Sequence, residues 1–387
     1  MYQNRASPAP LSRDAGSPMI RLAMLHDTPA CEVVSGLALG LLETGRVEPT
    51  IVCYSTEPPL SWLPPEVRIH RLGVDRALRS PPGLIRYLRT DRPDVLITRQ
   101  VHANFVGLAA AWMARIPPPW RGKIVVVQDQ LLESGHALDW RDNKWLAMAC
   151  YRFADGLIVP YPAVRDNAVR ACRLDPSSAA VVPTPIHRLS GPPGSAPPHP
   201  WLAEGEAPVF VSVSDLPAGS GADLLIDAFA ELRRDRDARL LVVGEGLGRA
   251  RADDQIRRLG LGDYAQTIGR VEDWRQFATR AQALVNAADR DVSGQTLTEA
   301  MSVGCPVVTT DSLGNGPRFV TEDGRCGLLV PQGDRAKLAE AMAAMLRPEI
   351  RARYSELALE YVKARSPLAC ASALVDFLSG HFGLHLP

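Results

Sequence analysis

Two carboxylates eight positions apart mark the segment of the chain whose residue types could do chemistry. Asp291 precedes Gly294, and Glu299 follows it on a helix-like stretch that leads to a Gly-Cys-Pro turn. Gly294 would let the backbone approach a ligand closely. The amides of residues 295–297 would then point out of a helix N-terminus, which is a natural site for a phosphate. Glu299, one turn further on, could accept hydrogen bonds from a sugar diol, and Asp291 could face a transferred sugar.

Apolar runs of strand length alternate with helical segments in the first half of the chain, and these elements must position such a site. We predict strands at Ile20–Leu25, Thr50–Tyr54, Pro93–Ile97, Ile124–Val127, Gly156–Val159 and Ala180–Val182. Helical spacing runs from Val33 to near Gly45 and from Asn104 to near Ala114. Strands that alternate with helices form β-α-β units around a parallel sheet. Because the strands are apolar along nearly their whole length, we expect both faces of the sheet to be covered.

A stretch rich in Pro, Gly and Ser, Ser190–Pro200, interrupts this pattern and is typical of an interdomain linker. The pattern then restarts, with strands predicted at Val209–Val213, Leu240–Val243, Gln266–Ile268, Ala283–Asn286, Pro306–Thr309 and Gly327–Val330. The predicted fold class is α/β, with two Rossmann-like doubly wound domains that face a central cleft. We expect a disordered extension over 1–18, a first domain over 19–188, a linker over 189–204, a second domain over 205–366 and a final helix over 367–387.

Charge and cysteine content exclude several classes of function. The chain has 43 Lys and Arg residues and 43 Asp and Glu residues, so its formal net charge is zero. A protein that neutralises nucleic-acid phosphates would carry a basic excess, so we expect no nucleic-acid partner. The seven cysteines are scattered and favour neither a disulfide framework nor a zinc site. This cysteine usage, and the absence of an apolar run of about 18 residues, predict a cytoplasmic protein without a transmembrane helix.

The segment from Asp291 onward resembles a known family. It reads DVSGQTLTEAMSVGCPVV, and the retaining GT-B enzymes of glycosyltransferase family 4 read roughly EGFGxxxLEAMAxGxPVV at their E-x₇-E region. The segments DLLIDAF at 223–229, LLVVGEG at 240–246 and IGRV at 268–271 also fall in family order. The resemblance covers 209–343 well. It is weaker in the first half, where it rests on 93–97, His102 and the VVPTPI stretch at 181–186.

The resemblance implies a role for each candidate site residue. Glu299 would bind the ribose hydroxyls of a nucleotide, and Asp291 would approach the donor sugar as a catalytic group, together with His102. Arg270 and Val271 would line the base pocket. Other donor contacts would come from the loop and helix residues Ser214, Asp215, Ser220, Gly294, Gln295, Thr296 and Leu297. The family's final helix crosses back to the first domain, and here it would bury Leu368, Ala371, Leu374, Val375 and Leu378.

The implied function is the retaining transfer of a sugar from a nucleotide-diphosphate donor, with a UDP- or GDP-sugar expected, to a hydroxyl acceptor. The acceptor would be a glycan or a lipid-linked glycan in bacterial cell-surface glycan or lipopolysaccharide assembly. The first domain would hold the acceptor and the second domain the donor. The arrangement requires neither a metal nor another cofactor.

One departure from the family pattern leads to an alternative function. Family members usually carry an Arg and a Lys that clamp the diphosphate, where this chain has Asp215 and Ser220. Charge-assisted contacts are each worth about 1.5–3 kcal/mol, so their loss would weaken donor binding and leaving-group stabilisation. Arg249, Arg251 or Arg318 could replace them. The alternative is a catalytically impaired glycosyltransferase-like protein that acts in binding or scaffolding.

Seven arginines crowd the 25 residues from Arg68 to Arg92, which contain only two acidic residues. With Leu84, Ile85, Tyr87 and Leu88 interleaved, this region could form a patch that contacts the inner face of the cytoplasmic membrane. The other interpretation is an ordinary solvated helix face.

Overall fold

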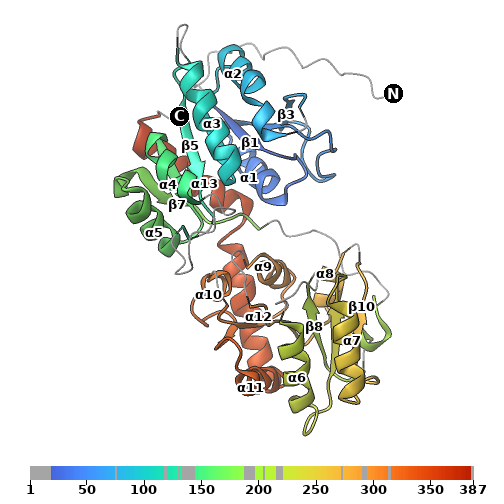
Figure 1. Cartoon of the computed structure of the whole chain (residues 1–387). Helices are drawn as coiled ribbons and strands as arrows, with labels where there is room; N and C mark the ends of the chain where they lie inside the picture. The colour runs from blue at the N-terminus through green and yellow to red at the C-terminus, as the bar shows by residue number, and fades with distance from the viewer. Residues whose placement is uncertain are drawn as a thin grey trace, which may run out of the picture.

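The computed structural model describes residues 19–74, 76–116, 120–129, 131–132, 144–186, 197–203, 205–214, 221–271, 273–289, 294–312 and 315–384. Two parallel sheets, each covered by helices, form two domains that lie one above the other in Figure 1. The predicted extension at 1–18 and most of the predicted linker at 189–204 lie outside the described residues. The α/β class with two Rossmann-like domains is confirmed.

The first sheet has seven parallel strands in the order β3-β2-β1-β4-β5-β6-β7. Their bounds are β1 Ile20–His26, β2 Val47–Cys53, β3 Arg68–Arg71, β4 Val95–Arg99, β5 Lys123–Val127, β6 Gly156–Val159 and β7 Ala179–Val181. The intervening helices are α1 Glu32–Glu43, α2 Pro81–Thr90, α3 Val101–Ala114, α4 Lys144–Cys150 and α5 Pro162–Cys172. Because the strand order reverses between β1 and β4, the carboxyl ends of these two strands open a crevice at which ligands bind in such sheets.

The second sheet repeats this design with six parallel strands in the order β10-β9-β8-β11-β12-β13. The strands are β8 Val209–Val213, β9 Arg239–Val243, β10 Ala265–Ile268, β11 Ala283–Asn286, β12 Val307–Thr310 and β13 Leu328–Val330. The helices are α6 Ala222–Leu232, α7 Arg249–Arg258, α8 Arg275–Ala278, α9 Gln295–Ser302, α10 Gly316–Val320, α11 Arg335–Met345 and α12 Pro348–Lys363. The strand order of this sheet reverses between β8 and β11, so the carboxyl ends of these two strands open a second crevice. Helix α9 follows β11 and begins at this crevice.

The arginine-rich region does not form a single helix face. Arg68 and Arg71 belong to β3, a four-residue edge strand that we did not predict because it contains only one apolar residue. Arg68 forms an ion pair with Glu48 of β2 at 2.6 Å. Leu84, Tyr87 and Leu88 of α2 are buried in the first core, and Ile85 is partly buried against it, so these apolar side chains do not form an exposed patch. Five of the seven arginines therefore belong to three different elements, β3, the 3₁₀ turn Ala77–Arg79 and α2, and Arg76 and Arg92 lie in the connections.

The final helix, α13 Pro367–Phe382, packs against α1 of the first domain, although α12 before it belongs to the second (Figure 1). Ser366 caps the helix, as predicted, by accepting a hydrogen bond from the amide of Ala369. Of the predicted stripe, the side chains Ala371, Leu374, Val375 and Leu378 are buried. Leu368, in contrast, is 44% exposed. The backbone of Pro367 lies so close to Gly40 of α1 that any side chain on Gly40 would clash with it. At this end of α13 the backbone itself therefore contacts α1, and the side chain of Leu368 does not.

Candidate functional site

A pocket of about 800 Å³, including its open mouth, lies between the two domains and is called here the interdomain pocket. The first domain lines it with residues that follow the carboxyl ends of its strands. The second domain lines it chiefly with α8, α9 and the end of α12. The lining residues are Glu32, Val33, Arg99, Asp129, Pro160, Tyr161, Thr184, Pro185, Ile186, Arg275, Gln295, Thr298, Glu299, Ser302, Tyr361 and Arg365.

Gly294 is the N-cap residue of α9, and two structural features favour glycine there. Gly294 adopts a φ of +61°, which glycine tolerates best, and a Cβ atom at this position would lie 2.4 Å from Cγ2 of Val320. The side chain of Leu297 is buried in the second domain, so only its backbone is available to a ligand. Gln295, in the first turn, donates a hydrogen bond from Nε2 to Oε1 of Glu299 at 2.8 Å. The helix thus fixes Glu299 in the pocket close to its own N-terminus.

Burial raises the pKa of Glu299 above its ordinary value. The hydrogen bond from Gln295 opposes this shift, the negative charge of Glu32 adds to it, and the positive charge of Arg275 opposes it. Arg275 lies between acidic groups of both domains: Nη1 is 3.3 Å from Oε1 of Glu32, and Nε is 2.9 Å from Oδ1 of Asp273. The pocket therefore holds a carboxylate whose pKa burial raises and whose neighbours, Gln295 and Arg275, oppose that shift.

Arg275 is joined in the pocket by two more arginines that sequence reasoning did not identify. Arg99 ends β4 and donates from Nε to Oδ2 of Asp129 at 2.9 Å. The guanidinium carbon of Arg365 lies 3.5 Å from the centre of the Tyr361 ring. Only Arg99 carried a sequence signal, because it lies two residues after the predicted strand Pro93–Ile97. Arg275 and Arg365 reach the pocket through long-range packing, which no local pattern reveals.

The three arginines proposed from sequence as replacement phosphate ligands lie elsewhere. Arg251 pairs with Asp223 at 2.6 Å, and Arg318 pairs with Asp311 and Asp323. Arg249 donates from Nε to Oγ1 of Thr267, at the end of β10. None of the three lines the interdomain pocket.

The remaining predicted site residues divide into two groups. Arg270 and Val271 follow the edge strand β10, Ser214 follows β8, and an exposed His102 lies in the first turn of α3. These four do not line the interdomain pocket, and neither do Thr296 and Leu297 of α9. Asp215, Ser220 and Asp291 lie outside the described residues. Of the predicted set, the structure brings together only Gln295 and Glu299 in the pocket.

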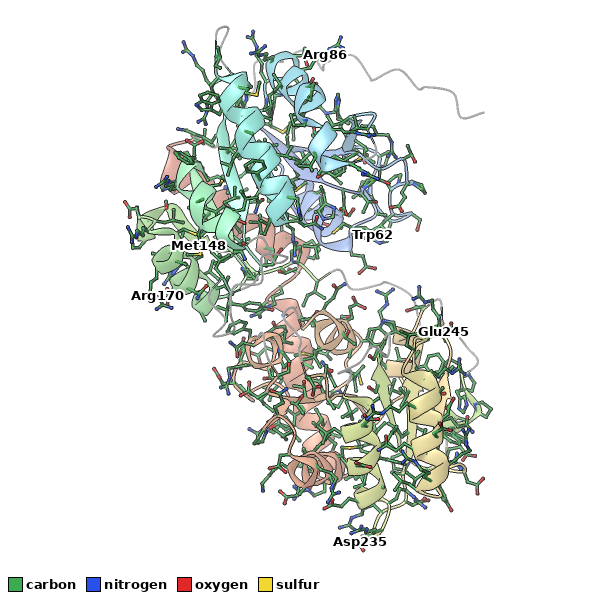
Figure 2. All side chains as sticks on the ribbon, viewed as in Figure 1. Trp62, Arg86, Met148, Arg170, Asp235 and Glu245 are labelled. Carbon is green, nitrogen blue, oxygen red and sulfur yellow. The ribbon has the colours of Figure 1, made fainter. Side chains whose placement is uncertain are left out.

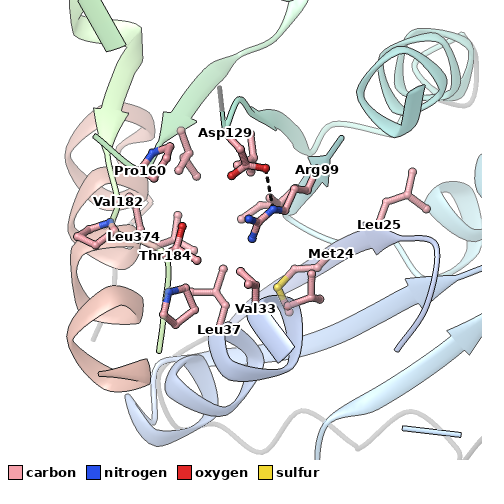
Figure 3. A pocket seen from close by; sticks show the side chains of 16 residues that line it. Met24, Leu25, Val33, Leu37, Arg99, Asp129, Pro160, Val182, Thr184 and Leu374 are labelled. Carbon is pink, nitrogen blue, oxygen red and sulfur yellow. Dashed lines mark hydrogen bonds and ion pairs between the residues drawn. The ribbon is translucent and has the colours of Figure 1, made fainter. Parts of the chain in front are cut away.

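A second, mostly apolar pocket adjoins this site within the first domain (Figure 3). Met24, Val33, Leu37, Val182 and Leu374 supply apolar walls. The Arg99–Asp129 pair lies on its boundary, because both residues line both pockets. The interdomain pocket therefore continues into a more apolar recess on the side of the first domain.

Two family descriptions match the two halves of the chain. Residues 32–185 match "Glycosyl transferase 4-like domain", and residues 199–360 match "Glycosyl transferases group 1". Together these ranges contain every described strand of both sheets except β1. The chain belongs to glycosyltransferase family 4. The resemblance stated from the sequence is thus confirmed.

Similar glycosyltransferases come from several bacteria. A phosphatidyl-myo-inositol mannosyltransferase of Mycobacterium leprae is 34% identical over 166 residues, which are 41% of this chain and 42% of that protein. An alpha-D-kanosaminyltransferase of Streptomyces kanamyceticus is 29% identical over 179 residues, or 45% of each chain. These matches span less than half the length of either relative.

Solved structures establish the GT-B fold. The Anabaena protein HepE, solved in complex with UDP, superposes with a TM-score of 0.71 over 94% of this chain and 100% of its own, at 18% identity. The sucrose-phosphate synthase of Thermosynechococcus elongatus superposes with a TM-score of 0.70 over 95% of this chain and 100% of its own, also at 18% identity. The two-domain arrangement is therefore that of a GT-B glycosyltransferase.

Proposed function

We propose that this family 4 protein transfers a sugar, with retention of configuration, from a nucleotide-diphosphate donor to a hydroxyl group. The observation that carries the proposal is Glu299, a carboxylate one turn into α9 in a pocket that both domains line. A carboxylate in this place can accept hydrogen bonds from both hydroxyls of a ribose. The N-terminal amides of α9 then lie where the attached phosphates need hydrogen-bond donors.

The protein's contribution to the reaction is chiefly electrostatic. As the sugar leaves, negative charge develops on the diphosphate, and amides and arginines that already point into the pocket stabilise that charge. Arg275 lines the pocket beside Glu299, where its positive charge opposes the burial that raises the pKa of Glu299, and Arg99 lines the pocket from the first domain. Approach of the two domains around the donor would exclude water and so favour transfer over hydrolysis.

The relatives support a nucleotide-sugar donor and a cell-surface acceptor. HepE has been solved with UDP-glucose, and a Mycobacterium tuberculosis relative is a GDP-mannose-dependent alpha-mannosyltransferase that is 28% identical over 161 residues. A Rhizobium meliloti relative acts in lipopolysaccharide core biosynthesis and is 29% identical over 137 residues. We therefore propose a UDP- or GDP-sugar as donor and a glycan or lipid-linked glycan as acceptor.

A transfer assay tests the proposal. The protein is incubated with each nucleotide sugar and a panel of glycan acceptors, and products are detected by mass and by the anomeric proton in nuclear magnetic resonance spectra. We expect a product with the same anomeric configuration as the donor. A product of inverted configuration would overturn the retaining mechanism.

Asp215 and Ser220 favour a second candidate, a binding or scaffolding protein without transferase activity. Their positions normally hold the two cations of the phosphate clamp. The double variant Asp215→Arg, Ser220→Lys separates the candidates. If the native protein is impaired, the variant should gain at least about tenfold in donor affinity, the effect of one charge-assisted contact. Ordinary turnover by the native protein would exclude this candidate.

We also propose that the first domain contacts an anionic membrane surface. Leu78 and Trp112 are each 70% exposed, and Met113 is also exposed. Arg89 of α2 donates to the carbonyl of Met113, which places a guanidinium beside this apolar surface. Arg86 lies at the end of the first domain that faces away from the second (Figure 2). Exposed apolar side chains among arginines match the lipid interface of an anionic bilayer.

The described part of the chain has no helix that is long and apolar enough to cross a bilayer, so the proposed contact is peripheral. Sedimentation with phosphatidylglycerol-containing vesicles tests it. Arg86→Glu should reduce vesicle binding about 30-fold, since one basic residue near such a surface contributes about 1 kcal/mol and charge reversal doubles the loss to about 2 kcal/mol. Trp112→Ser should also reduce vesicle binding, because it removes an exposed apolar side chain from this surface. Leu247→Ser, at a fully exposed site of the second domain, is the matched control and should bind normally. Equal binding of all three variants, or binding to neutral vesicles alone, would contradict the proposal.

A further inference from the structure

The mostly apolar pocket of the first domain, called here the apolar recess, carries its polar groups in one place. It has a volume of about 540 Å³, including its open mouth, which is the size of a small-molecule site. Among the described residues that line it, only Arg99, Asp129 and Thr184 are polar. All three also line the interdomain pocket. The polar side chains of the recess therefore lie at its junction with that pocket, and the remainder of its wall is apolar.

The apolar wall is built from both core and partly exposed side chains. Met24 of β1, Ile97 of β4 and Leu374 of α13 are buried in the first core. Val33 and Leu37 of α1 are only partly buried. These two residues are four positions apart, so they lie on the same face of the helix, and both line the recess (Figure 3). An apolar group that enters the recess would cover them and gain the free energy of leaving water.

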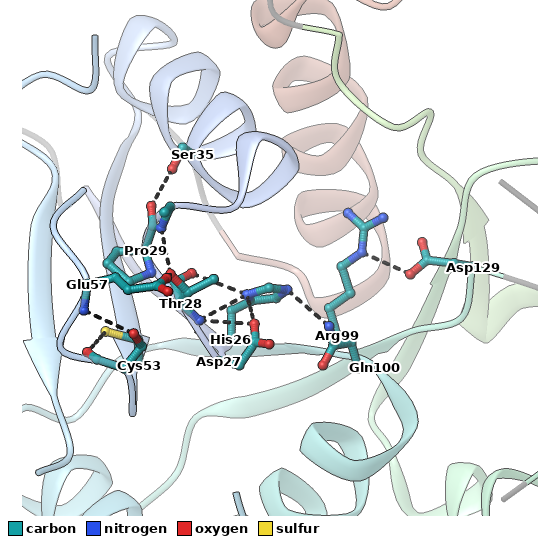
Figure 4. Close-up of polar contacts among 12 residues, drawn as sticks. His26, Asp27, Thr28, Pro29, Ser35, Cys53, Glu57, Arg99, Gln100 and Asp129 are labelled. Atoms are coloured by element: carbon teal, nitrogen blue, oxygen red, sulfur yellow. Dashed lines mark hydrogen bonds and ion pairs between the residues drawn. The ribbon is translucent and has the colours of Figure 1, made fainter. Parts of the chain in front are cut away.

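An ion pair stands at the junction of the two pockets. Arg99 ends β4, Asp129 follows β5, and Nε of Arg99 lies 2.9 Å from Oδ2 of Asp129 (Figure 4). The two side chains remain 21% and 30% exposed. A guanidinium can donate hydrogen bonds to a polar ligand group, and a carboxylate can accept them from a hydroxyl. The combined site thus fits a molecule with one polar and one apolar end, whereas a wholly polar ligand would leave the apolar wall uncovered.

From this arrangement we propose that the apolar recess holds an alkyl or aryl group of the acceptor, whose hydroxyl end lies at the Arg99–Asp129 pair. The word acceptor rests on the proposed function, in which Glu299 holds the donor on the other side of the interdomain pocket. The recess opens into that pocket from the first domain, so an acceptor seated in it faces the donor. Its polar end occupies the junction, and its apolar end is removed from water.

The position of the recess narrows the class of acceptor further. The recess adjoins the second domain, because it shares residues with the interdomain pocket. Arg86, in the proposed membrane contact, lies at the opposite end of the first domain (Figure 2). An apolar group in the recess is therefore not at the same time part of a chain embedded in the bilayer. The acceptor is a compact amphiphile whose apolar group adjoins the hydroxyl end.

The first test uses 1-alkanols from propanol to octanol as probes, without a nucleotide sugar. Met24 lines the recess, so its methyl group reports binding in nuclear magnetic resonance spectra of protein labelled with carbon-13 at the methionine methyls. Met24→Leu assigns its resonance. We expect a saturable shift of this resonance, with an affinity that rises about fourfold per methylene group until the recess is full. The exposed Met113 reports binding elsewhere on the first domain. No shift at Met24, or a shift at Met113 alone, would overturn the proposal.

The second test changes the size of the recess in both directions. Leu37→Trp should fill it and weaken 1-hexanol binding about tenfold or more, the effect of roughly two methylene groups. Leu37→Ala should enlarge it and shift the preference toward longer alkanols, which a general loss of stability cannot do. Leu247→Trp, at a fully exposed position of the second domain, is the matched control and should bind like the native protein. An unchanged chain-length preference in both Leu37 variants would contradict the proposal.

A transfer assay separates this inference from the proposed function. With the preferred donor, hexyl glycosides should have a KM at least about tenfold below that of the matching methyl glycosides, because only the hexyl group reaches the recess. Equal KM values in an active enzyme would overturn the acceptor assignment and leave the transferase function standing. No transfer to any acceptor, together with normal alkanol binding at Met24, would contradict the transferase function and the acceptor assignment but not the recess as a binding site.

Discussion

Replacing Glu299 with Gln should weaken donor binding about 10- to 100-fold while the fold keeps or gains stability. The amide cannot form the charge-assisted hydrogen bonds that a carboxylate accepts from ribose hydroxyls, each worth about 1.5–3 kcal/mol. Calorimetric titration with the preferred nucleotide sugar measures the loss. Glu340→Gln, on the exposed face of α11, is the matched control and should bind like the native protein.

The expected effect on stability follows from the sign of the pKa shift at Glu299. Burial raises this pKa in the folded state, so at neutral pH the unfolded chain carries the charge more readily than the folded chain. The ionised group therefore opposes folding, and this cost disappears as pH falls through the interval between the unfolded and folded pKa values. Glu299→Gln should remove the cost at pH 7. Its thermal midpoint should match or exceed that of the native protein.

Acidification should reproduce the binding defect in the native protein. Protonated Glu299 has lost its charge and can no longer accept charge-assisted hydrogen bonds on both oxygens. Its raised pKa places this loss at a higher pH than for an ordinary glutamate, whose pKa is about 4.3. Donor affinity measured from pH 7 downward should fall accordingly. If Glu299→Gln instead binds the donor normally and is strongly destabilised, Glu299 has a structural role.

Replacing Leu374 with Ala should destabilise the first domain by about 2–5 kcal/mol, although residue 374 follows every strand of both sheets. Leu374 is fully buried against the first domain, where α13 packs with β1 and α1. The matched control is Leu368→Ala on the same helix, because Leu368 is 44% exposed. Hydrogen exchange should accelerate in β1 and β2 of the Leu374 variant while β8 and β9 stay protected. Equal acceleration of hydrogen exchange in both domains would contradict the claim that α13 stabilises the first domain.

Local patterns in the sequence predict the sheets well because buried parallel strands are continuous apolar runs. The strands β6, β8 and β11 have the bounds that the sequence predicted. The polar strand β3 was missed because it lacks such a run. The pocket was predicted only in part: the helix that carries Glu299 has a local signature, whereas Arg275 and Arg365 arrive through packing between domains.

The turn after β1 shows the same limit at short range. The hydroxyl of Thr28 accepts a hydrogen bond from the amide of Ala30, and the His26 ring lies between this turn and Gln100 at the start of α3. Spacing alone carries none of this information, so the sequence did not predict these contacts.

The central claim is that the interdomain pocket binds a nucleotide sugar through Glu299. The most direct measurement is calorimetric titration of the native protein and Glu299→Gln with UDP-, GDP- and dTDP-sugars. We predict that sugars of one nucleotide bind the native protein in a one-to-one ratio and that Glu299→Gln loses this binding. No binding by any donor, or equal binding by both proteins, would contradict the claim.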